Sequence, residues 1–250
     1  MSLYKESGVV LRSMRLGEAD RIVTLLCAEN GKVRAVAKGV RKTTSRFGGR
    51  LEPLSHVAVQ CWRGRGDLDV VTQVEVVHAF RHVREDLDLI GPALAMLEAV
   101  DQIAQERDAA PHLFRMLLGA LSALETSRSP LVGPSFFLKL LVLDGSAPVV
   151  EACAACARPA AELAPDGLVA FDLAEGGMLC RSCRRGVAVS PAAWRLLRRI
   201  LGGDLAAVLS EEPDPATGEV AMLAAGAIEY HLDRRLQSLR VGQPRRTGGL

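Results

Sequence analysis

Four of the six cysteines are arranged in two pairs that suit a metal ion. Cys153-Ala-Ala-Cys156 and Cys180-Arg-Ser-Cys183 are CxxC pairs separated by 23 residues. Two such pairs at about this separation are typical of a tetrahedral zinc site. Because four thiolates leave no coordination position open for water or substrate, the sequence predicts one structural Zn²⁺ rather than a catalytic metal.

Two other interpretations of these pairs stay open: redox-active disulfides and unligated thiols. A redox CxxC motif normally opens a helix within a βαβ unit, and the sequence around these cysteines does not show that context. Four arginines beside the pairs would offset the charge of the thiolates and favour zinc: Arg158, Arg181, Arg184 and Arg185. The other two cysteines, Cys27 and Cys61, stand alone in apolar runs and are expected to be buried.

The second feature with possible chemistry is a run of cations. Seven fall within 19 residues with no acid among them: Lys32, Arg34, Lys38, Arg41, Lys42, Arg46 and Arg50. Lysine and arginine are phosphate ligands, and the glycines and hydroxyl side chains of the same segment supplement them. The run predicts DNA binding through phosphate contacts, which carry no sequence information. The alternative is an ordinary solvated basic loop.

Aromatic residues make up only 4% of the chain, although proteins that bind single strands usually stack bases on several rings. The predicted barrel described below contains Tyr4, Phe47, Trp62 and Phe80. Phe47 lies inside the basic run and is the best candidate for stacking. The alternative is that Phe47 anchors the loop by packing on the barrel.

Charge is unevenly spread along the 250 residues. The chain has a net charge of +2, but residues 1–84 carry +7, residues 85–150 carry −5 and the remainder is neutral. A basic first third on a nearly neutral chain indicates a local site for a polyanion. The sequence shows no signal-peptide pattern and no apolar run of membrane-spanning length, so we expect a cytoplasmic protein without membrane contact.

Alternation of apolar and polar residues predicts five strands, at residues 8–13, 21–27, 32–37, 56–62 and 69–77. Asn30-Gly31 predicts a two-residue hairpin turn, in which both positions tolerate positive φ. Five strands in about 75 residues favour an OB-fold barrel over the alternative, an SH3-like barrel. The cations then fall on the third strand and the loop that follows it, where OB barrels bind single strands.

Helical periodicity begins after residue 85. A stripe that starts at Leu87 predicts the first helix, and others are predicted from Pro111, over 134–144, from Pro191 and over 219–239. We therefore expect an α+β protein with an N-terminal OB-fold at 1–80 and an α-helical domain at 81–150 and 186–240. The zinc-binding insert occupies 151–185, and 241–250 forms a flexible tail.

The sequence contains no recognisable catalytic constellation. It has neither a P-loop nor a dinucleotide-binding fingerprint, and the five histidines form no metalloprotease or triad-like pattern. We expect a protein that binds its partners and catalyses no reaction.

Four separated segments carry a resemblance to a known family: residues 17–32, 37–42, 137–153 and 230–240. In this order they resemble the RecO family of bacterial DNA repair and recombination proteins, in its zinc-bearing branch. The resemblance implies an OB-fold that binds single- and double-stranded DNA and anneals complementary strands. It also implies a complex with RecR, docking on the acidic tail of single-stranded-DNA-binding protein, help in loading RecA, and a place at the nucleoid.

Two functions of other classes stay open: an OB-fold, zinc-knuckle protein that binds RNA in translation or transcription, and a redox enzyme that uses its CxxC pairs. For the acidic tail of single-stranded-DNA-binding protein, Phe136 and Phe137 beside Lys139 are the candidates for an apolar slot with a cation at its rim. The alternative is that both rings belong to the core.

Overall fold

The computed structural model describes residues 2–40, 47–64 and 66–240. The chain forms two compact units, one comprising Met1–Glu125 with Leu236–Leu250 and the other Thr126–Arg235. The domain limits expected from the sequence stay predictions, and the predicted flexible tail at 241–250 lies outside the described residues.

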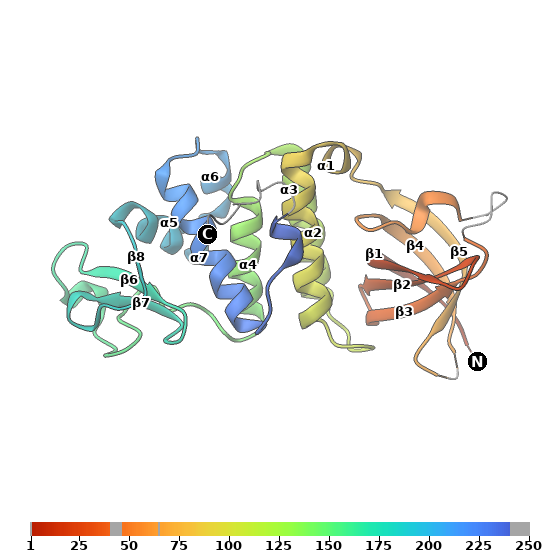
Figure 1. The fold of residues 1–250 in the computed structure, drawn as a ribbon, viewed down its shortest axis with the longest axis horizontal. Helices are drawn as coiled ribbons and strands as arrows, with labels where there is room; N and C mark the ends of the chain where they lie inside the picture. The colour runs from red at the N-terminus through yellow and green to blue at the C-terminus, as the bar shows by residue number, and fades with distance from the viewer. Residues whose placement is uncertain (1, 41–46, 65, 241–250) are drawn as a thin grey trace, which may run out of the picture. The chain divides into compact units, whose positions relative to one another are not determined.

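The first unit begins with a closed barrel of five strands (Figure 1). The strands are β1 (Leu3–Leu16), β2 (Asp20–Cys27), β3 (Gly31–Ala37), β4 (His56–Trp62) and β5 (Asp69–His78). They pair in the order β1-β2-β3-β5-β4, and β4 returns to β1. All pairs are antiparallel except β3 with β5. This OB-like barrel confirms the prediction, and alternate residues such as Val33, Ala35 and Ala37 fill its core.

The hairpin between β2 and β3 is confirmed, but its turn is not the predicted two-residue type. Cys27 pairs with Gly31, so three residues link the strands. Gly31 has a φ of 57°, whereas Asn30 does not have a positive φ. Asn30 instead donates from its backbone amide and its side chain to the carboxylate of Glu6, at 3.0 and 2.6 Å. Gly31 is also required by space, because a Cβ there would lie 1.7 Å from the carbonyl oxygen of Asp108.

Three helices follow the barrel in the first unit: α1 (Arg81–Glu85), α2 (Leu87–Ile103) and α3 (Pro111–Thr126). The predicted stripe on α2 is wrong at its first residue, since Leu87 is 84% exposed. Leu97 and Val100 of that stripe are buried as predicted, and Leu89 and Ala93 lie on the same buried face. Leu87 follows the N-cap Asp86 directly and begins the first turn on the solvent side. α3 begins at Pro111 as predicted.

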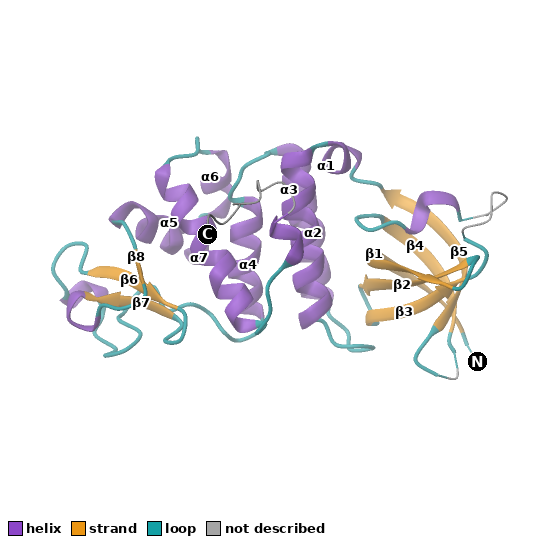
Figure 2. Ribbon diagram, viewed as in Figure 1, coloured by secondary structure: helices purple, strands orange, loops and turns teal. Residues whose placement is uncertain are grey.

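The second unit contains four helices and a small sheet, which Figure 2 distinguishes by colour. The helices are α4 (Val132–Leu143), α5 (Pro191–Gly202), α6 (Leu205–Ser210) and α7 (Pro215–His231). The sheet has the order β7-β6-β8, formed by β6 (Leu168–Asp172), β7 (Gly177–Cys180) and β8 (Val187–Ala188). Short 3-10 helices occupy Gly48–Leu51, Ala160–Glu162, Arg181–Cys183 and Gln237–Arg240. In the described part of the chain, no helix has the length and apolar character needed to cross a membrane.

The predicted final helix over 219–239 is wrong at both ends. α7 begins at Pro215, where the side chain of Asp214 caps it, and ends at His231. Beyond it, Leu236 is fully buried. The backbone amides of Gln237 and Ser238 donate to the carboxylate of Glu98 on α2, both at 3.1 Å. Residues 236–240 therefore belong to the first unit. The spacing of apolar residues in the sequence does not predict these contacts with Glu98.

We predict that Leu236→Ala lowers the free energy of unfolding by about 2–5 kcal/mol, the usual cost of emptying a buried leucine site. Leu87→Ala removes the same atoms from an exposed position, so it should change stability by about 0.5 kcal/mol or less. Urea unfolding of both full-length variants checks this. Equal urea midpoints for the two variants would show that burial of Leu236, in the segment 236–240 after α7, contributes nothing to stability.

Candidate nucleic-acid interface and metal site

Two buried residues within the basic run, on either side of residues 41–46, hold it on the barrel. Val40 and Phe47, which bound residues 41–46, are buried and belong to the barrel core. Just before Val40, Gly39 has a φ of 66° and donates from its amide to the carboxylate of Asp20 at 2.8 Å. The stacking role for Phe47 is therefore wrong and the anchor alternative is confirmed, since only 2% of the residue is exposed. Both ends of this part of the run are fixed by burial.

The structure separates the seven predicted cations into three groups. Lys38 and Arg50 are exposed, while Arg41, Lys42 and Arg46 lie outside the described residues. The Lys32 ammonium donates to the carbonyl oxygen of Asp101 at 2.7 Å and lies 3.9 Å from the carboxylate of that residue. A guanidinium nitrogen of Arg34 lies 3.7 Å from a carboxylate oxygen of Glu106. Lys32 and Arg34 thus connect β3 to residues 101–106.

The outer face of β1, β2 and β3 combines apolar and basic side chains. The strand registers place Met14, Ile22 and Val36 side by side on neighbouring strands. Because Ala35 and Ala37 point into the core, Val36 points outward, and so does Lys38 beyond it. Aliphatic side chains can pack against the faces of bases and cations can hold phosphates. This face therefore has the chemistry needed to bind a nucleic-acid strand.

Trp62, which the sequence places in the barrel without a predicted role, is 44% exposed at the end of β4. The signal was available in the alternation of that strand. Val57, Val59 and Cys61 point into the core, so Trp62 has to point outward.

The four paired cysteines come together in the second unit. Their sulfur atoms all lie within 4.8 Å of one another, and those of Cys156 and Cys180 are 3.9 Å apart. A tetrahedral zinc ion with Zn–S bonds of about 2.3 Å requires sulfur–sulfur edges of about 3.8 Å. The cluster therefore has the size and the ligands of a zinc site, and zinc is compatible with it.

Backbone geometry brings the two pairs together and favours the thiolate form. The amide of Ala157 donates to the carbonyl of Cys153 at 2.8 Å and closes the first turn. β7 and the short helix after it supply the second pair. Burial opposes ionisation of Cys153, but amide hydrogen bonds from Cys180, Cys156 and Ala155 outweigh it and lower the pKa to about 6. Hydrogen bonds with the Cys180 and Cys156 side chains raise the pKa of Cys183 to about 12. The amide hydrogen bonds thus favour the thiolate form of Cys153, which is the form that binds a metal ion.

The arginines beside the cluster differ in their partners. Arg185 forms ion pairs with Asp172 and Glu175 on and after β6. Arg158, Arg181 and Arg184 are exposed, and in the described part of the chain none of them has a carboxylate within 4 Å. These three are the arginines still available to offset thiolate charge.

The two isolated cysteines are buried, as expected. Cys27 and Cys61 are each 1% exposed in the barrel core. Burial, above all other effects, raises the pKa of Cys61 to about 12 and also raises that of Cys27. Thiols held in the neutral form are poor nucleophiles and poor metal ligands, so both cysteines act as core side chains.

The apolar slot predicted at Phe136 and Phe137 is wrong. Both rings are buried, and they contact one another edge to face with centroids 6.1 Å apart. The alternative, that both belong to the core, is confirmed.

Comparisons with known proteins cover almost the whole chain. Residues 1–80 match the family model described as recombination protein O N terminal, and residues 84–240 match the one described as recombination protein O C terminal. The chain is 43% identical over 248 residues to the DNA repair protein RecO of Thermobifida fusca (strain YX), covering 96% of this chain and 98% of that protein. It is 42% identical over 247 residues to the DNA repair protein RecO of Nocardioides sp. (strain ATCC BAA-499 / JS614), with coverages of 95% and 98%.

We predict that Lys32→Met destabilises the protein by about 1–3 kcal/mol, because it removes a charged donor from the Asp101 carbonyl and carboxylate. Lys38→Met removes the same charge from an exposed position and should change stability by about 0.5 kcal/mol or less. Urea unfolding distinguishes the two variants. Unchanged stability for Lys32→Met would mean that its contact with Asp101 contributes nothing.

Proposed function

Because the chain belongs to the RecO family, we propose that it is a DNA-binding recombination mediator that acts in DNA repair. It anneals complementary single strands and helps RecA to load onto strands coated by single-stranded-DNA-binding protein. Both relatives are DNA repair proteins by name, which favours this interpretation over an RNA-binding protein or a redox enzyme.

The observation that carries the proposal is the basic run held on an OB-like barrel by Val40 and Phe47. Repulsion between two phosphate backbones limits the annealing of complementary strands. A basic surface that holds both strands lowers this barrier without any bond being made or broken. The proposed function therefore needs no catalytic residue and no ATP.

We assign phosphate contacts on single- and double-stranded DNA to five cations: Lys38, Arg41, Lys42, Arg46 and Arg50. Lys32 and Arg34 are each close to a carboxylate, so they add less to the field felt by DNA. The outward-facing apolar side chains of Met14, Ile22 and Val36 pack against bases. Together these contacts hold a strand with little preference for sequence.

The proposal includes three protein partners. RecR forms a complex with the chain, and the acidic tail of single-stranded-DNA-binding protein docks on its helical part at a place other than Phe136 and Phe137. RecA is reached indirectly, through the coated strand onto which it loads. These interactions place the protein in the cytoplasm at the nucleoid.

We also propose one structural Zn²⁺ held by Cys153, Cys156, Cys180 and Cys183. Bound zinc would compensate the thiolate charge and cross-link two turns that are 23 residues apart in the chain. The supporting observation is the mutual distance of at most 4.8 Å among the four sulfur atoms.

We predict that Lys38→Ala/Arg41→Ala/Lys42→Ala weakens binding to all DNA sequences about equally. The slope of log K against log salt on single strands should fall in magnitude by about 0.7 for each phosphate that is no longer neutralised, or about 2 in all. Fluorescence anisotropy over a salt series measures both effects. The control, Arg12→Ala/Arg21→Ala, removes barrel cations that already pair with Asp101 and Glu52, so it should change the slope less. An unchanged slope for the triple variant would rule out the basic run as the DNA site.

Metal analysis of the purified protein should give one zinc per chain. Cys156→Ser should abolish zinc binding, while Ser182→Ala, which keeps all four thiolates, should retain it. Since structural zinc contributes on the order of 10–16 kcal/mol in isolated fingers, zinc loss should also lower the melting temperature. A fully folded preparation with four free thiols and no metal would contradict the assignment.

A further inference from the structure

Among the phenylalanine, tyrosine and tryptophan rings that the structure describes in the barrel, one is exposed. Phe47 and Phe80 are buried. Tyr4 is half-buried, donates from its hydroxyl to Asp69 at 2.5 Å and lies under the guanidinium of Arg63 at 5.4 Å. Trp62 is 44% exposed, whereas the other tryptophan, Trp194, is buried. An indole on the open face of a barrel offers a large flat surface for stacking.

The neighbours of Trp62 extend this surface. In the strand register Trp62 pairs with Leu3 on β1, and Leu3 is 46% exposed. On its other side Trp62 pairs with Val70 on β5. Leu3 and Trp62 therefore form an exposed apolar ledge across neighbouring strands of the barrel.

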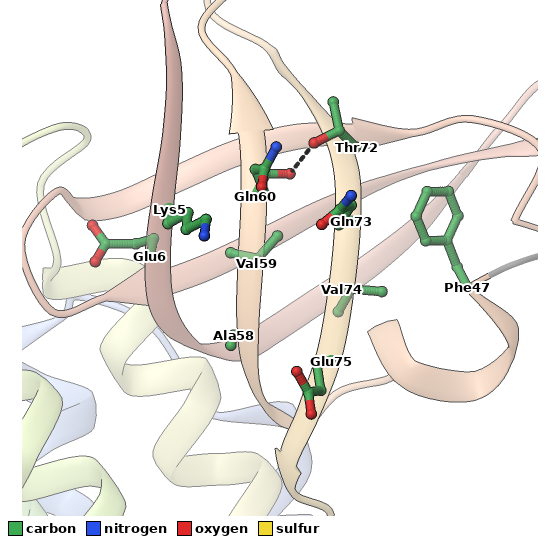
Figure 3. Close-up of a pocket in the computed structure, with 10 residues that line it drawn as sticks. All are labelled: Lys5, Glu6, Phe47, Ala58, Val59, Gln60, Thr72, Gln73, Val74 and Glu75. Carbon is green, nitrogen blue, oxygen red and sulfur yellow. Dashed lines mark hydrogen bonds between the residues drawn. The ribbon is translucent and has the colours of Figure 1, made fainter.

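The outward-facing residues that come next along β1, β4 and β5 have polar side chains. Lys5 pairs with Gln60, and Gln60 pairs with Gln73, so an ammonium group and two carboxamides lie side by side on three strands. These residues line an open hollow of about 530 Å³ on the outer face of β1, β4 and β5, which Figure 3 shows. Glu75 also lines this hollow and adds a negative charge to it.

This set of side chains matches a single DNA strand. The indole and leucine side chains suit the face of a base, and carboxamides donate to and accept from base edges. Lys5 suits a phosphate. Glu75 repels phosphate, so the backbone should run on the Lys5 side of the hollow with its bases turned inward. A base in a duplex is covered on both faces by its neighbours, so stacking on Trp62 requires an unpaired base.

We propose that Trp62 stacks an unpaired base of single-stranded DNA, and that Leu3, Lys5, Gln60 and Gln73 complete this second strand-binding surface. It lies on β1, β4 and β5, whereas the basic run continues from β3. The inference rests on the proposed function, because it assumes that the chain binds DNA. It adds a contact that distinguishes single strands from duplex, which phosphate neutralisation alone does not do.

The test compares full-length wild type, Trp62→Ala and Trp62→Phe on two ligands of equal length: an oligothymidylate and an abasic strand with the same phosphates. The wild type should bind oligothymidylate more tightly than the abasic strand. Trp62→Ala should bind oligothymidylate about tenfold more weakly than wild type and the abasic strand equally well. Trp62→Phe keeps a ring and should retain most of the affinity.

Tryptophan emission gives a second readout. Oligothymidylate should quench the emission of Trp194→Phe, in which Trp62 is the remaining tryptophan, and should leave that of Trp62→Phe unchanged. If Trp62→Ala binds oligothymidylate as tightly as wild type, or is weakened equally on both ligands, the stacking role is overturned while DNA binding itself stands. If wild type binds neither ligand, the proposed function fails and the inference fails with it.

Discussion

Burial of Val40 and Phe47 in the barrel core is the contact on which the proposed DNA site depends. Burying side chains of this size contributes about 1.5–3 kcal/mol each, enough to hold both ends of a segment whose cations repel one another. Without these two buried side chains, the basic run would not be held on the barrel. With them, the described ends of the run are held on the barrel beside β3, where Val36 and Lys38 point toward solvent. A polyanion bound there relieves the remaining repulsion between the cations.

The acidic middle of the chain complements the basic barrel. Asp101 lies within ion-pair distance of Arg12 and Lys32, and Glu106 lies within that distance of Arg34. Two more acids of the same stretch hold parts of the first unit together. Glu98 accepts from the amides of Gln237 and Ser238, and Glu125 binds His78. The net charge of −5 at residues 85–150 thus serves in part to hold helices on the barrel. Lys32 and Arg34 are therefore close to carboxylates, whereas Lys38, just beyond β3, is exposed.

The sequence predicted most of the elements because their signals are local. Alternation located β4 at its observed limits, Pro111 marked the start of α3, and the CxxC spacing identified the four cysteines that cluster. Features that depend on distant partners were missed. Nothing near Lys32 in sequence shows that Asp101 accepts from it, and nothing near Phe47 shows that the barrel core has room for its ring. The segment after α7 depends on Glu98, which is more than a hundred residues away. Trp62 is different, because alternation along β4 already places it outside.

We propose that a basic surface held on a barrel brings complementary strands together without chemistry. The most direct test is the annealing rate of two complementary oligonucleotides coated with single-stranded-DNA-binding protein, measured with the full-length chain and without ATP. The rate should rise well above that of the coated strands alone and should fall as salt is added, because the effect is electrostatic. A rate equal to that of the coated strands alone, at every salt concentration, would contradict the account.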